Sequence, residues 1–318
     1  MDPREVANPT YELLSRVFFD ADAARELLEA MRWPDGPVCP HCGAAGGYKL
    51  TAKPGSKRPV RAGVYKCKAK ACKRQYTVTV GTVFAESHVG LHKWMYAIHL
   101  MCSAKKGISA RQLERTLGVQ YKTAWFMCHR IRKAMEAEPL AGLLSGIVEA
   151  DETYVGGKAR RGGPPGGKPK SVVFAMVERK GRARSQVVAD VTAETLQSVL
   201  VEELDPATRV MTDGLQSYRG LAAHFAEHSA IDHDKEYVRG VVHTNTVESL
   251  FSLLKRGIMG TYHRLSRKHL GRYVGEFDFR WNHRDIPDGA RMVAAVVAAK
   301  DKRLYYRPPK GGGGHAAG

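Results

Sequence analysis

The sequence predicts a multidomain α/β protein in which small helical and cysteine-containing units precede a mixed-sheet domain. Two pairs of closely spaced cysteines lie near the N-terminus, apolar residues then follow helical spacing, and strand-like runs alternate with helical ones after Pro139. A chain of 318 residues is also longer than the size at which a single hydrophobic core usually stops growing. We therefore expect five segments, which comprise residues 1–35, 36–85, 86–138, 139–308 and 309–318.

The first of these segments is expected to be helical. Between Tyr11 and Trp33 the apolar residues recur at helical spacing, and the pattern is interrupted near Asp20. One or two short helices are predicted there. The stretch WPDGPVCPHCG then supplies the proline and glycine residues that usually separate units.

Four cysteines define the second segment. Cys39 and Cys42 form a C-P-x-C pair, and Cys67 and Cys72 form a C-x4-C pair after a short basic stretch. Two such pairs are typical of a zinc ribbon, in which four thiolates complete a tetrahedron around one structural Zn²⁺ ion. The alternative is four unrelated buried thiols. Cys102 and Cys128 lie among apolar residues at helical spacing and are expected to pack in the core.

Basic residues outnumber acidic ones, 50 to 32, which gives a formal net charge of +18. This balance favours a polyanionic partner, and we expect double-stranded DNA. No acidic residue lies between Gly36 and Ala85, whereas ten basic ones do: Lys49, Lys53, Lys57, Arg58, Arg61, Lys66, Lys68, Lys70, Lys73 and Arg74. This block suits contact with phosphates, although it could also serve solubility alone.

The third segment has the pattern of a helix-turn-helix. A helical run from His92 to Ala104 is followed by two further helical patterns, with Gly118 at the bend between them and the second starting near Tyr121. The second helix would present to DNA the residues Gln120, Lys122, Thr123, Arg130 and Lys133. A helical hairpin that only packs is the alternative.

After Pro139 the pattern is that of three strands, a helix, a strand, a short helical stretch near 215–225, a short extended piece and a further helix. This order suits a ribonuclease-H-like mixed sheet. Thr192 is the expected cap of the first helix. The stretch between the first two strands, residues 156–170, is rich in glycine and proline and carries Lys158, Arg160 and Arg161, which suggests a mobile basic arm near phosphate or, alternatively, a solvated loop. The tail, GGGGHAAG, is expected to be disordered.

Three carboxylates are expected to converge in such a sheet. Asp151 lies in the first strand, Asp213 ends the fourth strand, and Glu248 lies on the following helix. Together they suit two Mg²⁺ or Mn²⁺ ions, because hard divalent ions prefer oxygen ligands and can assist displacement at phosphorus. Taken singly, each could be a solvated surface carboxylate. Strand alternation puts Glu149 on the face of Asp151, where it could assist the metal site, and Glu152 on the other face.

The helix around Glu248 carries a second charged group. Lys255 follows Glu248 by seven residues, almost two helical turns, so the two side chains point the same way about 10 Å apart along the axis. A loose, solvated ion pair is the alternative. His243 and Asn245 are expected either to orient DNA or to cap and pack the helix, and Phe277, Phe279 and Trp281 of FDFRWNHR are expected to be buried.

Five separated motifs resemble those of the ISXO-type group of bacterial insertion-sequence transposases, which join a zinc ribbon and a helical DNA-binding segment to a DDE catalytic domain. The motifs are RWPDGPVCPHCG, ADETYVGGK, TDGLQSY, HTNTVESLFSLLKRGIMGTYH and FDFRWNHR, and the resemblance runs from about Tyr11 to Arg284. It implies that Asp151, Asp213 and Glu248 form the catalytic metal-binding triad. Lys255 matches a basic residue that some DDE transposases use to contact DNA, and Arg256 is assigned to the same surface.

The resemblance implies a DNA transposase that binds the terminal inverted repeats of its own element and catalyses metal-dependent strand cleavage and strand transfer. The alternatives are a DNA-binding repressor or domesticated protein without catalysis and, less favoured, a structure-specific nuclease on the same fold. A homodimer or larger homo-oligomer is expected, since two DNA ends must be held together. The N-terminus, MDPREVANPTYELL, lacks the features of a signal peptide, and no apolar run reaches membrane-spanning length, so we expect a bacterial cytoplasmic, nucleoid-associated protein.

Overall fold

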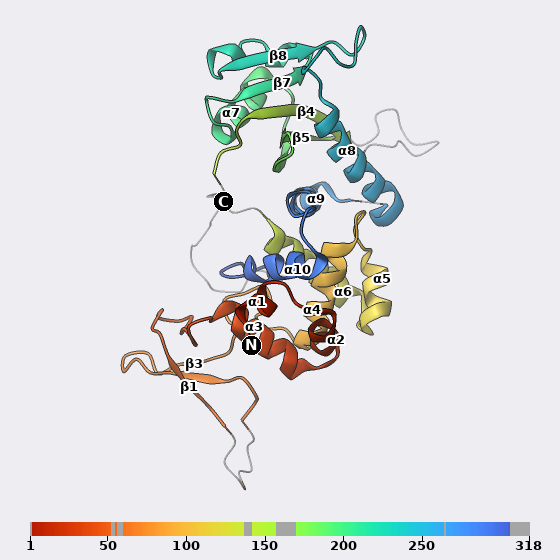
Figure 1. Ribbon diagram of the computed structural model, residues 1–318. Coiled ribbons are helices and arrows are strands. Elements are labelled where there is room, and N and C mark those ends of the chain that lie inside the picture. Colours follow the sequence, from red (N-terminus) through yellow and green to blue (C-terminus); the bar gives the residue numbers. More distant parts are fainter. Residues whose placement is uncertain are drawn as a thin grey trace. The chain divides into compact units, whose positions relative to one another are not determined.

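A computed structural model describes residues 2–51, 55, 60–136, 142–156, 170–263 and 265–305 (Figure 1). The chain divides into two units, described separately below. The first unit contains Met1–Ser103, Ala110–Ala134 and the residues from Pro287 onward, and the second contains Ala104–Ser109 and Met135–Ile286. No helix in the described part of the chain is long and apolar enough to cross a membrane.

The first unit begins with α1 (Pro3–Ala7), α2 (Tyr11–Phe19) and α3 (Ala21–Arg32). Asp20 separates the last two, because its carboxylate accepts hydrogen bonds from the backbone N–H groups of Asp22 (2.8 Å) and Ala23 (3.3 Å) at the start of α3. This is the break that the sequence predicted, whereas α1 was not predicted. The last helix, α10 (Asp288–Val297), packs against α3 and α4 (Leu91–Ser103) in this unit, although the sequence pattern had placed it in a segment with the sheet.

Three short antiparallel strands lie in the cysteine-containing part of the first unit. They are β1 (Gly47–Lys49), β2 (Tyr65–Cys67) and β3 (Gln75–Tyr76), in the order β1-β2-β3. Trp33, Tyr65 and Tyr76 form an aromatic cluster with ring centroids 5.3–5.8 Å apart. Stacked and edge-to-face aromatic pairs of this kind stabilise a unit that is too small to build a large core.

The helical hairpin expected from the sequence is present in the first unit. It consists of α5 (Ala110–Leu117) and α6 (Tyr121–Met135), and Gly118 in the turn between them has a φ of +60°, a conformation that favours glycine. Cys102 on α4 and Cys128 on α6 are both buried, as predicted. Most of α6 after its first turn is buried as well, so only its N-terminal end faces solvent freely.

The second unit is built on a five-stranded mixed sheet. Its strands are β4 (Ile147–Val155), β5 (Ser171–Glu178), β6 (Ala183–Val188), β7 (Arg209–Asp213) and β8 (Glu227–Ile231). The spatial order is β6-β5-β4-β7-β8, with β5 antiparallel to both β4 and β6, and β7 parallel to both β4 and β8. This is the ribonuclease-H-like topology that the sequence predicted.

Helices cover both faces of this sheet (Figure 1). One face packs against α7 (Ala193–Glu203), which Thr192 caps as predicted, and against two 3₁₀ turns, Gln216–Tyr218 and Leu221–Ala223, which replace the single helical stretch expected there. The other face packs against α8 (Asn245–Gly257) and α9 (Leu270–Asn282). Burial on both faces explains why β5 is an almost continuous apolar run. Between α8 and α9 the chain forms a π turn (Ile258–Tyr262) and a 3₁₀ turn (Arg267–His269).

Candidate active site

The four paired cysteines gather into one cluster in the first unit. The Sγ atoms of Cys39 and Cys72 are 3.8 Å apart, those of Cys42 and Cys67 are 3.6 Å apart, and all four lie within 4.8 Å of one another. Thiolates at about 2.3 Å from a tetrahedral Zn²⁺ ion would stand roughly 3.8 Å from each other. The donor set and its dimensions therefore fit one structural zinc ion with no open position.

A second cluster, of carboxylates, lies in the other unit. Strands β4 and β7 run parallel with Glu149 opposite Met211, so two residues further on Asp151 and Asp213 stand side by side on one face. The carboxylate oxygens of Asp151, Glu152 and Asp213 lie within 4.8 Å of one another. Asp213 is held in place because its Oδ1 accepts a hydrogen bond of 3.0 Å from the backbone N–H of Leu215.

Glu152 joins this cluster although strand alternation puts it on the opposite face from Asp151. Strand β7 ends at Asp213, so the C-terminal half of β4 has no neighbour on that side and the Glu152 side chain can reach the end of β7. The buried hydroxyl of Tyr218 donates a 2.7 Å hydrogen bond to Glu152 Oε2 and orients it. Strand alternation had favoured Glu149 over Glu152 as the additional carboxylate near Asp151. That prediction missed Glu152 because the alternation pattern does not show where β7 ends beside β4.

Crowded negative charge changes the acidity of these groups. Burial raises the pKa of Asp151 to about 7, and the neighbouring charges of Glu152, Asp213 and Glu248 act in the same direction. Burial also raises the pKa of Glu152, while the hydrogen bond from Tyr218 opposes that rise. A site that gathers carboxylates at this cost in electrostatic free energy suits a cation that compensates their charge.

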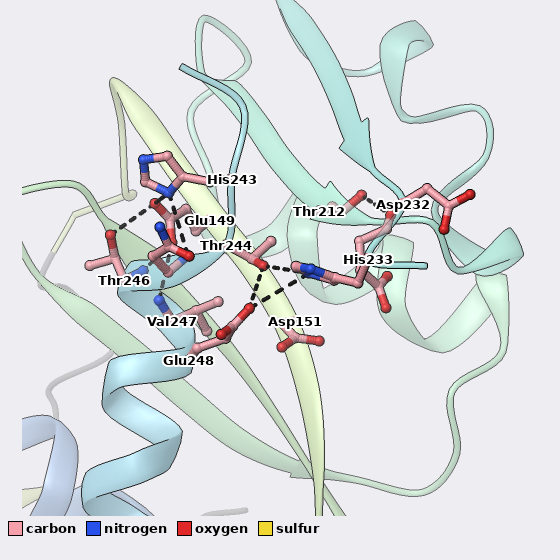
Figure 2. Close-up of polar contacts among 12 residues, drawn as sticks. Glu149, Asp151, Thr212, Asp232, His233, His243, Thr244, Thr246, Val247 and Glu248 are labelled. Atoms are coloured by element: carbon pink, nitrogen blue, oxygen red, sulfur yellow. Dashed lines mark hydrogen bonds and ion pairs between the residues drawn. The ribbon is translucent and has the colours of Figure 1, made fainter. Parts of the chain in front are cut away.

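Glu248 lies on the first turn of α8, beside Asp151 (Figure 2). It stands outside the group of three carboxylates that approach within 4.8 Å. The buried Thr244 hydroxyl donates a 2.9 Å hydrogen bond to Glu248 Oε1. His233 Nε2 lies 3.0 Å from the Thr244 hydroxyl and 3.6 Å from Glu248 Oε1, so this histidine, which was not predicted from the sequence, helps to orient the carboxylate.

Glu149 does not join the carboxylate cluster. Its side chain is fully buried and turns to the N-terminus of α8, where it accepts hydrogen bonds from the backbone N–H groups of Thr246 and Val247. His243 Nδ1 lies 3.2 Å from the same carboxylate and 3.4 Å from the backbone nitrogen of Asn245, so His243 belongs to the packing of this helix end. No signal in the sequence links Glu149 to residues almost a hundred positions away.

Lys255 and Arg256 are exposed on the last turn of α8. Arg256 Nε donates a 3.1 Å hydrogen bond to the carbonyl of Ser252, and its guanidinium is otherwise accessible from solvent. Lys158, Arg160 and Arg161 lie outside the described residues. Of the aromatic residues predicted to be buried on α9, Phe277 and Phe279 are buried and Trp281 is partly buried.

The residues predicted to face DNA in the helical hairpin fall into two groups. Gln120, Lys122 and Thr123 lie at the accessible N-terminal end of α6, along a groove of about 470 Å³. Arg130 also lines this groove, but it is 6% exposed, donates a 2.6 Å hydrogen bond to the carbonyl of Ala85 and lies over the Trp94 ring. Its contacts are those of a packing residue. Lys133 is partly buried further along α6.

Comparison with known proteins matches both the sheet-containing and the cysteine-containing parts of the chain to transposase domains. Residues 143–282 match the ISXO2-like transposase domain and residues 20–75 match the transposase zinc-ribbon domain. A relative from Halobacterium salinarum, described as an uncharacterized protein in transposable element ISH50, is 30% identical over 288 residues, which cover 83% of this chain and 92% of the relative. The chain, with its zinc ribbon and its sheet-borne carboxylates, thus belongs to the family of ISXO2-like transposases.

Proposed function

We propose that this transposase binds the terminal inverted repeats of its own element and catalyses metal-dependent strand cleavage and strand transfer. The observation that carries the proposal is the convergence of Asp151 and Asp213 from adjacent parallel strands, with Glu248 beside them on α8, in a domain of the transposase family. Glu152 is an additional carboxylate of the same site.

The carboxylate cluster fits a hard divalent cation. Six oxygens around Mg²⁺ at about 2.1 Å stand roughly 3 to 4.2 Å apart, and the oxygens of Asp151, Glu152 and Asp213 lie within 4.8 Å of one another. Asp151, Asp213 and Glu248 would hold two Mg²⁺ or Mn²⁺ ions, with Glu152 supporting them. Such ions supply the positive charge that activates an attacking oxygen and stabilises a leaving oxygen in displacement at phosphorus.

The other side chains would bind and orient the DNA. Lys255 and Arg256 are accessible cations on the helix that carries Glu248, so they can contact phosphates close to the reacting bond. Gln120, Lys122 and Thr123 at the exposed end of α6 are the candidates for reading base edges, and the basic ribbon would add phosphate contacts. Lys133, Lys158, Arg160 and Arg161 remain candidates for the same role, whereas burial makes Arg130 a poor one. Two copies of the chain are expected to hold the two ends.

The test incubates the purified protein with duplex DNA carrying the ends of its element, with and without Mg²⁺, and maps nicks and joined products at nucleotide resolution. We expect cleavage at the element boundary, followed by joining, only when the metal is present. Asp151→Asn and Asp213→Asn should bind the DNA but yield neither product. Selective binding by the wild-type protein without any cleavage would show instead a DNA-binding protein that does not catalyse transposition.

A further inference from the structure

We infer that Glu149 is a positioning residue that fixes the N-terminus of α8 on β4 and thereby places Glu248 beside Asp151. This inference rests on the proposed function of Asp151, Asp213 and Glu248. The Glu149 side chain contacts the first residues of α8 and lies outside the carboxylate cluster, so its effect on the metal site would pass through the position of that helix (Figure 2).

The first observation is the way α8 begins. A helix leaves its first backbone N–H groups without partners inside the helix, and a side chain at the N-cap usually accepts from them. Here the N-cap residue, Thr244, makes no such bond, because its hydroxyl donates to Glu248 instead. Glu149 Oε2 takes over this role from another element, accepting from the N–H groups of Thr246 at 2.6 Å and Val247 at 3.1 Å.

The second observation is the number of partners of this one carboxylate. Glu149 is 0% exposed, and its Oε1 also accepts from the Thr246 hydroxyl at 2.8 Å and from Arg179 Nε at 2.7 Å. Arg179 lies directly after β5 and donates further to the carbonyls of Val241 (2.7 Å) and His243 (3.1 Å), which lead into α8. The guanidinium therefore holds the incoming chain while the carboxylate holds the helix. Charge-assisted hydrogen bonds of this kind are strong and directional in a buried setting.

The third observation is where these bonds lie relative to the metal site. Glu149 and Asp151 are two residues apart on the same face of β4, and Val247, whose N–H is bound, directly precedes Glu248. The same Glu149 carboxylate thus links the strand of Asp151 to the turn of Glu248. Glu248 is about half exposed, and Thr244, whose hydroxyl orients its carboxylate, is the N-cap of the same helix, so the position of the helix start largely decides where that carboxylate stands.

The matched control is Glu276 on α9, a second fully buried carboxylate of the same unit that pairs with an arginine, Arg280, and accepts a 2.7 Å hydrogen bond from the Tyr262 hydroxyl. Removing its charge should disturb the fold about as much as removing the charge of Glu149. Both of these partners lie outside the N-terminal turn of α8, so a purely structural role of Glu149 predicts the same behaviour for both variants.

The experiment measures Mn²⁺ binding to the full-length, zinc-loaded protein by electron paramagnetic resonance, together with stability towards urea. Asp151→Asn identifies the binding that belongs to the carboxylate site. We expect Glu149→Gln to weaken this binding about tenfold or more, as is common when a residue that orients metal ligands is removed, and Glu276→Gln to leave it within about twofold of the wild type. The double variant Glu149→Gln with Arg179→Gln keeps the net charge and should also bind Mn²⁺ weakly. This result would show that the position of α8, and not the loss of one negative charge near the ion, weakens the binding.

Thr246→Val provides the milder test if Glu149→Gln does not fold, because it removes a single hydrogen bond to Glu149 and keeps the buried ion pair. It should weaken Mn²⁺ binding by a smaller, measurable factor. Wild-type affinity in the folded Glu149→Gln or Thr246→Val proteins would overturn the inference and leave the proposed function intact. If the wild-type protein shows no Mn²⁺ binding that the Asp151→Asn substitution abolishes, the proposed function is overturned, and the inference with it.

Discussion

At the scale of single residues, Glu248 and Lys255 are expected to have separate roles on α8. Glu248→Gln keeps the size of the side chain and removes an anionic ligand, so cleavage and joining should fall by orders of magnitude while binding to end DNA persists. Lys255→Ala should leave the metal site intact and cause weaker, less salt-sensitive DNA binding with a partial loss of cleavage. Both variants are compared in one cleavage assay, with folding checked by circular dichroism. Near-normal cleavage by both would reduce the two residues to an exposed pair contributing at most about 1 kcal/mol to stability.

Asp278 on α9 should make the stability of the protein depend on pH independently of the carboxylate cluster. Burial raises its pKa to about 6, and its carboxylate accepts 2.7 Å hydrogen bonds from the backbone N–H and the hydroxyl of Ser185. An aspartate whose pKa is raised in the folded state binds its proton more tightly there, so its contribution to stability is present at about pH 4 and falls as the pH rises through about 6. Relative to Asp278→Asn, the free energy of unfolding of the wild type in urea should fall by roughly 2 to 3 kcal/mol across this range. A constant difference would contradict the assignment.

The sequence predicts which side chains meet where the expected sheet alone brings them together. Asp151 and Asp213 were predicted as neighbours because their places converge in a ribonuclease-H-like sheet, and the structure places their carboxylates within 4.8 Å of each other. The position of Glu152 depends on where a neighbouring strand stops, and that of Glu149 depends on which helix end packs above it. Neither is encoded in the local pattern around Ala150, so both required the three-dimensional structure.

At the scale of elements, local chemistry predicted the boundaries well. Asp20, at the predicted break in the apolar pattern, and Thr192, the predicted cap, accept hydrogen bonds from the first N–H groups of α3 and α7. One exception is 215–225, where two 3₁₀ turns replace a helix. Gly220 between them has a φ of +96°, which a continuing α-helix does not allow, and the Tyr218 side chain is directed to Glu152.

The zinc ribbon is the element whose stability should depend most on a bound ion. Its strands have two or three residues each, so they are too short to be stable alone, and the cysteine cluster joins the two ends of the ribbon. We expect one Zn²⁺ per chain by elemental analysis and its loss in the protein with both Cys39→Ser and Cys42→Ser. Because the mixed sheet lies in the other unit, its unfolding in urea should change little. Full zinc retention by the double variant would place the ion elsewhere.

At the scale of the whole molecule, the two units are not contiguous in the sequence. The helix α10 returns to the first unit, where it packs on α4, so the first unit is built from both ends of the sequence. Residues 288–297 were expected only as part of the segment 139–308, and their sequence does not say which core this helix joins. A fragment that starts near Pro139 and keeps the C-terminus would therefore expose the apolar face of α10, and tests of DNA binding are better made on full-length variants.

Basic residues of both the ribbon and the sheet unit contribute to the net charge of +18, so full-length variants can test which group of them binds DNA. The test would compare two full-length variants. In each of them four accessible cations are replaced by Ala, so that the net charge of each variant is +14 (18 − 4). One carries Ala at Lys66, Lys70, Lys73 and Arg74 of the ribbon, and the other carries Ala at Lys180, Arg219, Lys235 and Lys268 of the sheet unit. The affinity for end DNA is measured by fluorescence anisotropy between about 50 and 200 mM salt, a range over which phosphate contacts dominate the change in affinity. Removing one phosphate interaction lowers the slope of log affinity against log salt by about 0.9.

If the ribbon contacts phosphates as proposed, its variant should bind more weakly and its slope should fall by up to roughly 3 to 4, whereas the slope of the sheet variant should fall less. Zinc content reports whether the ribbon remains folded in the first protein, and Mn²⁺ binding reports the same for the carboxylate site in the second. Equal reductions in the two proteins would mean that only the total charge attracts DNA, and the basic block at 36–85 would then serve solubility. A larger reduction in the sheet variant would move the main DNA-binding surface to the sheet unit, because at equal net charge only the position of the cations distinguishes the two proteins.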